Sequence, residues 1–279
     1  MNRLSTEKRA KVIGALVEGN SIRATVRMTG VAKNTVTKLL LDLGEACSVY
    51  MNENLVNLTC RRIECDEIWS FVYAKAKNVP PGMENEAGDA WTWVALDSDS
   101  KLVVSYLVGN RGAAEAHALM TDVAGRLTDR VQLTTDGNRM YVTAIERAFG
   151  SEIDYAMLVK LYGHGPEQDS HITRYSPAEC TGTQRVVLMG DPDDDLISTS
   201  YVERQNLTMR MGMRRMTRLT NAFSKKVENL AAAVSLHFMH YNFARAHKTL
   251  SNPYPTSPAM AAGVSDHVWT LEEIARLLD

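Results

Sequence analysis

The sequence predicts a main domain of α+β or mixed α/β class, with a mixed sheet flanked by helices, preceded by a small all-α domain. Residues 1 to 46 carry apolar residues at helical spacing only, whereas from residue 61 onward β-branched and aromatic runs alternate with amphipathic stretches. In this second region three antiparallel-type strands precede a helix, a strand, a helix and a strand. With 279 residues and 45% apolar content, the chain is long enough for both domains.

The first 46 residues are predicted to form a helix-turn-helix unit. A first helix begins at Ser5 and ends near Gly19, a second spans 21–28, and a tight turn at 29–31 leads into a third helix at 34–43. In such units the third helix enters the major groove of DNA. A generic three-helix packing unit is the alternative. The polar and basic residues around the start of the third helix are the candidate DNA contacts: Lys33, Asn34, Thr35 and Lys38.

The catalytic domain is expected to span residues 61 to 252, after a connector at 47 to 60 and before a C-terminal tail with a short helix at 253 to 279. Residues 162 to 195, rich in Gly, Pro and Asp, are interpreted as an inserted loop. In chain order the other expected elements are strands at 63–72, 90–97 and 102–108, a helix at 113–127, a strand at 131–136, a helix at 140–149, a strand at 153–159, a helix around 200–210 and a long helix at 222–247.

Two aspartates stand in strand-like segments. Asp66 lies within a β-branched and aromatic run, and Asp136 ends a short apolar run before a glycine. An acid inside or at the tip of a strand is poorly solvated and needs a partner, for which a divalent cation is suited. Asp97 is another carboxylate at a strand end, but we interpret it as a cap of the turn at 98–100.

A third acid lies on the helix around 200–210. At 3.6 residues per turn, Glu203, Asn206 and Arg210 share one side, and Arg214 follows at the next step of four residues. A carboxylate there can ligate a cation while the planar fork of an arginine pairs with phosphate oxygens. A solvated face with a repeating charge pattern is the alternative. Two aspartates on neighbouring strands and a glutamate on a later helix are the arrangement used for two-metal phosphoryl transfer.

Four segments carry the most specific signal. In order they are Cys65–Trp69, Thr135–Gly137 with Tyr141, Glu203–Leu207 with Arg210, and Phe223–Glu228. This ordered set resembles the DDE transposases of the insertion-sequence-one family over roughly residues 60 to 250. The resemblance implies an RNase H-like catalytic domain in which Asp66, Asp136 and Glu203 ligate Mg²⁺ or Mn²⁺, with Arg210 as a catalytic basic residue. The spacer between Asp136 and Glu203 is longer than is usual in the family, and the family's cysteine-rich N-terminal finger is missing.

The function that this resemblance implies is DNA transposition, with metal-dependent cleavage at the ends of an insertion element followed by strand transfer. A nuclease of the same fold that hydrolyses DNA without strand transfer is one alternative. A non-catalytic helix-turn-helix regulator is another, and the three intact acids argue against it. The expected partners are double-stranded DNA, as element ends and target, and a second copy of the chain, because two ends must be cut in concert.

The charge distribution agrees with DNA as the partner. The net charge of the whole chain is −2, but residues 1–46 and 201–218 are each net positive. Acidic residues gather instead around 84–99 and 191–195, so DNA is expected at the two basic segments with the acidic loops facing elsewhere. Beyond the helix-turn-helix, the candidate DNA contacts are Arg204, Arg214, Arg215, Arg218, His247 and Lys248.

Composition also limits where the protein works. The chain has no run of about 18 apolar residues and no apolar secretory segment at its start, so we expect a soluble protein of the cytoplasm, associated with the nucleoid. The four cysteines, Cys47, Cys60, Cys65 and Cys180, form no C-x-x-C pair, which favours buried free thiols over a zinc site or a disulfide framework. His164 and His171 are interpreted as solvated loop residues.

Overall fold

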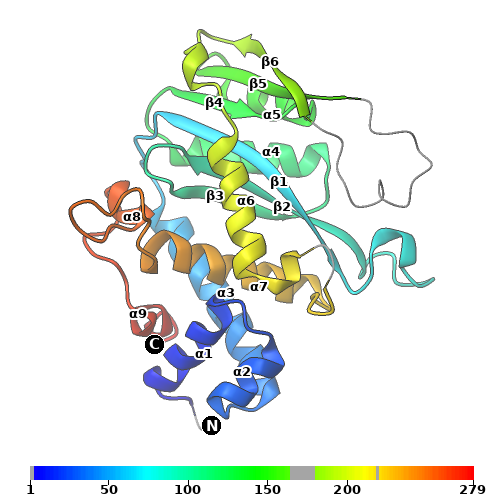
Figure 1. Cartoon of the computed structure of the whole chain (residues 1–279), viewed down its shortest axis with the longest axis vertical. Coiled ribbons are helices and arrows are strands. Elements are labelled where there is room, and N and C mark those ends of the chain that lie inside the picture. The colour runs from blue at the N-terminus through cyan, green and yellow to red at the C-terminus, as the bar shows by residue number, and fades with distance from the viewer. Residues whose placement is uncertain (1–2, 164–179, 218–219) are drawn as a thin grey trace.

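A six-stranded mixed sheet forms the centre of the protein (Figure 1). The computed structural model describes residues 3–163, 180–217 and 220–279. The strands lie in the order β3-β2-β1-β4-β5-β6 across the sheet. Their bounds are β1 Arg62–Val72, β2 Gly88–Asp97, β3 Val103–Gly109, β4 Val131–Thr135, β5 Ile153–Tyr162 and β6 Cys180–Met189.

The strand directions confirm the predicted fold class. The first three strands pair antiparallel, β1 pairs with β4 and β4 with β5 in parallel, and β5 pairs antiparallel with β6. Parallel neighbours need a crossover connection, and α4 (Ala113–Arg126) and α5 (Met140–Phe149) supply it before and after β4. The order and directions of the first five strands are those of an RNase H-like sheet, which β6 extends at one edge.

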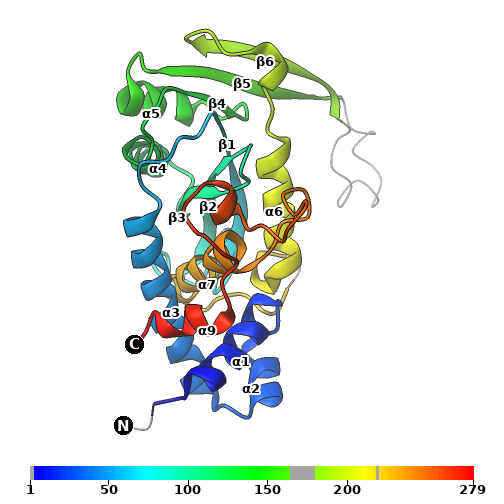
Figure 2. The same ribbon diagram turned by 90° about the vertical axis from the view of Figure 1, so that its left-hand side faces the viewer.

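Helices cover both faces of the sheet. The helices α4 and α5 lie on one face, and α6 (Ser200–Gly212) crosses the other (Figures 1 and 2). The buried residues of α4 recur at helical spacing, as its amphipathic sequence predicts. On this side Trp93 of β2 packs edge-on against Tyr141 of α5, with ring centroids 5.5 Å apart. The sheet is therefore buried where its central strands meet the helices.

Three helices precede the sheet: α1 (Thr6–Val17), α2 (Ile22–Thr29) and α3 (Lys33–Asn54). Gly30 ends α2 with a φ of 68°, a conformation that glycine adopts without a steric penalty. The third helix is longer than expected: residues 47–54, predicted to belong to a connector, are its last turns. The reason is that its apolar face continues through Cys47 and Met51, both buried.

The extended α3 packs against α7 (Val227–Met239). The two helices approach closely at Gly44, where an added Cβ would lie 2.4 Å from the Cβ of Ala232. Buried residues of α1 and α3 belong to the same continuous apolar cluster as those of the sheet. The domain boundary proposed at residue 46 stays a prediction.

The C-terminal segment departs from the expected long helix at 222–247. The α-helix α7 begins only at Val227, and a π-helical turn, His240–Ala244, follows it. Short helices α8 (Pro258–Ala261) and α9 (Leu271–Arg276) come next, and α9 packs against α1. Three 3-10 turns complete the elements: Ala76–Asn78, Asp194–Leu196 and Arg214–Met216.

The region interpreted as an inserted loop, 162–195, contains the strand β6. Its side chains are exposed or half-buried throughout, so it lacks the apolar alternation by which a strand is recognised. Exposed Cys180 begins this strand, which makes the prediction of buried thiols wrong for that cysteine and correct for the other three. His164 and His171 lie outside the described residues. No helix in the described part of the chain is both long and apolar enough to cross a membrane.

The interpretation of Asp97 as a turn cap is confirmed. Its carboxylate accepts hydrogen bonds from the backbone N–H of Ser100, at 3.0 Å, and from the Ser100 hydroxyl. Asp97 and Ser100 lie at the turn between β2 and β3, and Asp97 pairs with Ile63 of β1, three residues before Asp66.

We predict that Gly44→Ala lowers the free energy of unfolding by about 1–3 kcal/mol, because the new methyl group overlaps Ala232 across the α3–α7 contact. Gly125→Ala in α4 is the matched control: nothing lies within 4 Å of its added Cβ, and the change should stabilise the protein by up to about 1 kcal/mol. Urea unfolding followed by circular dichroism measures both, and equal effects would contradict the close helix contact.

Candidate active site

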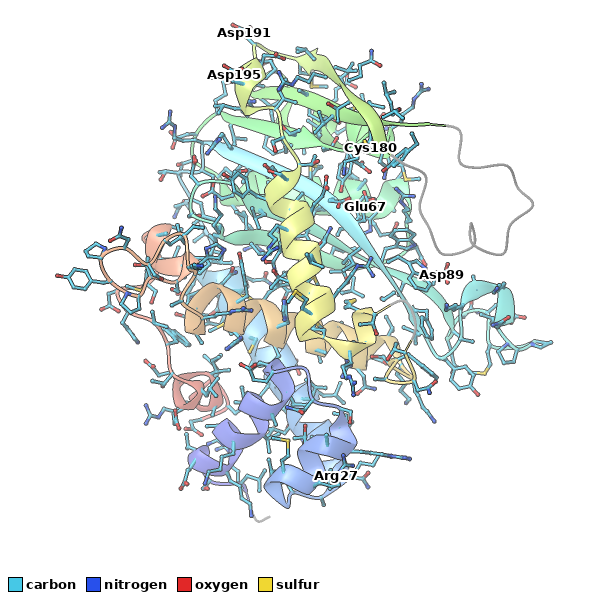
Figure 3. All side chains as sticks on the ribbon, in the orientation of Figure 1. Arg27, Glu67, Asp89, Cys180, Asp191 and Asp195 are labelled. Atoms are coloured by element: carbon cyan, nitrogen blue, oxygen red, sulfur yellow. The ribbon has the colours of Figure 1, made fainter. Side chains whose placement is uncertain are left out.

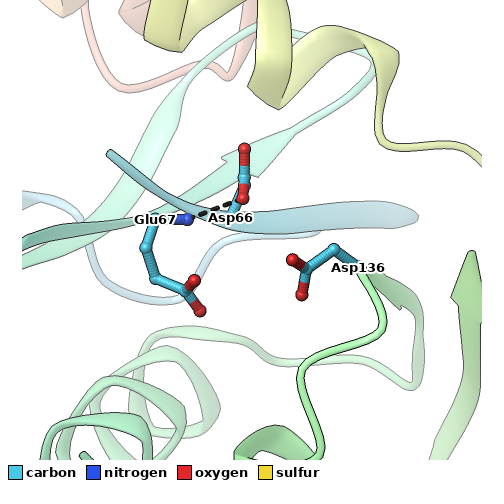
Figure 4. Close-up of side chains that lie close together, drawn as sticks. All are labelled: Asp66, Glu67 and Asp136. Atoms are coloured by element: carbon cyan, nitrogen blue, oxygen red, sulfur yellow. Dashed lines mark hydrogen bonds between the residues drawn. The ribbon is translucent and has the colours of Figure 1, made fainter. Parts of the chain in front are cut away.

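Asp66 and Asp136 lie together because of the β1–β4 register. The last parallel pair joins Cys65 to Thr135, so the next residue on each strand is one of the two aspartates. Ligand oxygens of Asp66, Asp136 and a third acid, Glu67, all lie within 4.8 Å of one another (Figure 4). The structure thus brings two of the three predicted acids into one cluster and adds an acid that sequence reasoning missed.

Glu67 joins the cluster from the opposite face of β1. Successive side chains of a strand alternate, so Asp66 turns toward α6 while Glu67 turns toward the α4 and α5 side. Since β4 ends at Thr135, the pairing of β1 on this side stops after Cys65 and resumes only at the bridge between Val72 and Ser224. Both carboxylates can therefore approach Asp136 around the open edge. The only sequence signal for Glu67 was a second acid next to Asp66 in an apolar strand.

The Glu67 carboxylate braces the loop that carries Asp136. Its Oε1 accepts a hydrogen bond from Asn138 Nδ2 at 3.0 Å, and the Asn138 backbone N–H donates to Asp136 Oδ1 at 2.9 Å. Its Oε2 pairs with Arg111 at 3.2 Å, and the Glu67 side chain is only 1% exposed. The Arg111 guanidinium also lies over the ring of Trp91, 4.7 Å from its centroid. Glu67 is thus held firmly and positions Asp136 through Asn138.

Asp66 is held from both sides. Its Oδ1 accepts from the backbone N–H of Glu67 and its Oδ2 from Asn206 Nδ2 of α6, both at 2.8 Å. Burial, followed by the negative charge of Asp136, raises the pKa of Asp66 to about 7. The same two causes raise the pKa of Glu67. Close carboxylates repel one another, so it costs free energy to ionise them all. A positive charge among them would offset this cost.

A hard divalent cation fits this cluster. All the candidate ligands are carboxylate oxygens, the type that Mg²⁺ and Mn²⁺ prefer, and they lie within 4.8 Å of one another where the β1–β4 pairing ends. A cation bound there would favour the ionised form of the acids and so offset the repulsion that raises the pKa of Asp66.

Glu203 lies on α6, which faces Asp66, but it stands apart from the 4.8 Å group. Its Oε1 accepts from Lys160 Nζ of β5 at 2.6 Å and from Thr199 Oγ1 at 2.5 Å. It still contributes to the raised pKa of Asp66. Burial by itself would lower the pKa of Lys160, but its hydrogen bond with Glu203 and the negative charges of Glu203 and Asp66, with Tyr162, together raise that pKa. Glu203 is therefore near the cluster and is neutralised by an ammonium group.

Helix α6 is fixed in place by Glu64, a buried acid that sequence reasoning did not single out. Its Oε2 accepts the backbone N–H groups of Tyr201, at 2.8 Å, and Val202, at 3.0 Å. These groups have no partner within a helix, and a carboxylate at a helix N-terminus is also favoured by the helix dipole. Glu64 lies two residues before Asp66 on the same face of β1, so one strand both carries the aspartate and anchors the helix with Glu203.

The predicted arginines after Glu203 take different positions. Arg210 Nη1 donates to the carbonyl oxygen of Met216 at 3.0 Å. The expectation that Arg214 follows on the same helix is wrong, because α6 ends at Gly212 and Arg214 begins a separate 3-10 turn. Arg215 Nη1 donates to Ser224 Oγ and to the Asn229 carbonyl oxygen, both at 2.8 Å, and braces the chain before α7.

A groove of about 960 Å³ brings together the two basic segments of the sequence. Its lining includes Lys33 at the start of α3 and Arg214 after α6, together with Arg23 and Lys225, all four exposed. The other candidates of the third helix also have exposed side chains: Asn34, Thr35 and Lys38. Predicted DNA contacts from both segments thus line one groove: Lys33 from the first segment, and Arg214 and Arg215 from the second.

The remaining candidates lie at a second positive region. The pKa of His247 is lowered by burial and then by the charges of Lys101, Arg245 and Arg204, so these residues are neighbours. Exposed Lys248 follows His247 in the chain. Arg218 lies outside the described residues.

The acidic run lies far from the N-terminal helices. Asp191 and Asp195 are at one end of the molecule, and Arg27 of α2 is at the other (Figure 3). Asp193 caps the 3-10 turn Asp194–Leu196 by accepting from the N–H of Asp195. The expectation that these acids face away from the basic segments agrees with this placement.

Comparisons with known proteins give weak structural likenesses only. No family model matches the chain, and no curated protein matches it. Among solved structures, a piggyBac transposase synaptic complex with hairpin DNA shares 10% identity at a TM-score of 0.36, covering 99% of this chain and 71% of that one. A Mos1 transposase paired-end complex with left transposon end shares 14% identity at a TM-score of 0.22, covering 53% of this chain. A pre-cleavage Mos1 transpososome shares 12% identity at a TM-score of 0.22, covering 56% of this chain.

The chain spans 58% and 60% of the lengths of the two Mos1 chains. At these identities and TM-scores, the fold assignment depends on the strand order and directions described above.

We predict that Asp66→Asn stabilises the metal-free protein more at pH 8.5 than at pH 5. An unfolded aspartate has a pKa of about 3.9, whereas the pKa of folded Asp66 is raised to about 7. Between these values the folded state holds a proton that the unfolded state lacks, so the free energy of unfolding falls as pH rises through this range. Asparagine does not ionise and avoids that loss.

Thermal unfolding in EDTA should show a midpoint for Asp66→Asn higher by roughly 3 °C or more at pH 8.5. Asp191→Asn, at an exposed position, is the control and should shift the midpoint little at either pH. An Asp66→Asn gain of equal size at pH 5 and pH 8.5 would contradict the raised pKa.

Proposed function

We propose that the protein is a DDE-type DNA transposase of the insertion-sequence-one type that its motifs resemble. One observation supports this proposal above the others: the carboxylates of Asp66 and Asp136 converge where the β1–β4 pairing ends, facing the helix that carries Glu203. Three acids from two adjacent parallel strands and a later helix are what two-metal phosphoryl transfer requires.

In this proposal Asp66, Asp136 and Glu203 hold two Mg²⁺ or Mn²⁺ ions. When bound, such ions supply the positive charge that stabilises the attacking and leaving oxygens of an in-line displacement at phosphorus. The chain's own task is to hold the three carboxylates in register. Glu67 keeps the Asp136 loop in place, and Asn206 orients Asp66.

DNA contact is proposed at the groove and at the second positive region. Around the start of α3, Lys33, Asn34, Thr35 and Lys38 would meet base edges or phosphates, and Arg214 would hold the backbone across the groove. Arg210, two turns after Glu203, would pair with a phosphate next to the scissile one. Double-stranded DNA and at least a second copy of the chain are the proposed partners, because two ends must be joined in concert.

The decisive test changes the three acids one at a time. Asp66→Asn, Asp136→Asn and Glu203→Gln should each lower Mg²⁺-dependent cleavage of the element's terminal DNA by more than about 100-fold. Binding of that DNA should stay close to wild type, because the acids ligate metal and do not read bases. Cleavage is followed on end-labelled duplexes, with Asp191→Asn as a control that keeps full activity. A variant that still cuts at the wild-type rate removes its residue from the site.

Strand transfer separates the transposase from the nuclease alternative. A pre-cleaved end with a free 3′ hydroxyl, incubated with supercoiled plasmid, should become joined to it in the presence of wild-type protein and Mg²⁺. Products of hydrolysis alone would favour a nuclease, and specific DNA binding without either reaction would favour a regulator.

The N-terminal helices are best tested by point changes, because a deletion of residues 1–46 would cut α3 ahead of its buried residues Cys47 and Met51. Lys33→Ala and Lys38→Ala should each weaken binding to terminal DNA, and each should reduce the slope of log affinity against log salt by about 1. Lys77→Ala, at an exposed position after β1, is the matched control. Fluorescence anisotropy from 50 to 200 mM salt measures the slopes. Unchanged slopes for both variants would exclude phosphate contacts at this helix.

A further inference from the structure

Lys160 occupies an unusual place at the edge of the acidic cluster. The β4–β5 pairing ends at Thr135 and Met157, so Lys160 lies on the part of β5 that extends past the end of β4. The side chain of its neighbour Val159 is 3.6 Å from the position of a Cβ built on Gly137, directly after Asp136. Because side chains alternate along a strand, Lys160 turns to the other face, where Glu203 receives it.

The ion pair between Lys160 and Glu203 is partly open to solvent. The two side chains are 32% and 38% exposed, and ion pairs of this kind contribute little to stability. Packing does not require a lysine here either, since the adjoining residues Leu161 and Tyr162 are exposed. A structural purpose therefore does not account for this ammonium group beside Glu203 and near Asp66.

The Lys160 ammonium lies where a metal cation ligated by Glu203 would lie. The oxygen that it contacts, Oε1, also accepts from Thr199, so both of its hydrogen-bonding positions are filled. A divalent cation ligated through Oε1 would compete with the ammonium for that oxygen, and on either oxygen of Glu203 its charge would repel the ammonium at short range. Lys160 must then move away from Glu203, and its flexible four-carbon stem lets it do so.

We propose that Lys160 is a DNA-contacting residue of this site, paired with Glu203 until metal binds and then transferred to a phosphate oxygen beside the scissile bond. This inference rests on the proposed function. The ligand is the phosphodiester backbone, since a compact ammonium binds phosphate as a point charge and needs no base. Lys160 approaches from β5, whereas Arg210 would approach from α6, so the two cations would hold the backbone from separate elements.

The first arm of the test measures metal binding without DNA. Lys160→Met keeps much of the stem and removes the charge, so Mn²⁺ should bind several-fold more tightly than to wild type in isothermal titration calorimetry. Lys77→Met, also a loss of one lysine charge but away from the acids, should leave the affinity unchanged. Circular dichroism checks that both variants fold. Unchanged or weaker Mn²⁺ binding by Lys160→Met overturns the proposal that the ammonium occupies the cation's place.

The second arm measures DNA cleavage at saturating Mn²⁺. Lys160→Met should lower the rate by about 10-fold or more, and Lys160→Arg should restore part of it because a cation is again present. A cleavage rate equal to that of Lys77→Met overturns the DNA contact, even if metal binds more tightly. If the wild-type protein cuts no DNA, the proposed function fails, and the calorimetric arm still decides whether Lys160 competes with metal.

Discussion

The end of the β1–β4 pairing is the constraint on which the site depends. Up to Cys65 and Thr135 the two strands pair through their backbone groups. The next residues, Asp66 and Asp136, are acids that lie just past this pairing. Like charges at this separation raise the free energy of the ionised protein, and burial adds to that cost. Such an arrangement is stable when a proton or a cation neutralises part of its charge. For this reason the end of the β1–β4 pairing indicates function more strongly than any single motif.

The surrounding contacts hold this repulsive group in place. Glu64 joins the N-terminus of α6 to β1, and Glu67 joins β1 to the Asp136 loop through Asn138. Each of these links uses a buried acid as a hydrogen-bond acceptor, so two acids of β1 hold the frame around Asp66. The order Glu64, Asp66, Glu67 in one strand thereby fixes the helix, the candidate ligand and the loop relative to one another.

Much of this architecture could be predicted from the sequence, for identifiable reasons. Asp66 and Asp136 stood out because a charged residue interrupts or ends an apolar strand, and the strand and helix order followed from periodicity. The role of Glu64 could not be predicted, because its partners are backbone groups 137 and 138 residues later in the chain. The strand β6 escaped notice because an edge strand exposed on both sides has no alternation. Helical spacing also predicted that the face with the arginines continues past Gly212, whereas α6 ends at that residue.

The unbroken course of α3 has a mechanical consequence. A helix of 22 residues is about 33 Å long. Its first turn is exposed beside the groove, and its later turns are embedded in the core with α7. A rigid rod of that kind has no hinge to absorb strain. In a protein of the proposed function, it would hold the exposed first turn at a fixed place relative to the sheet that carries the acids.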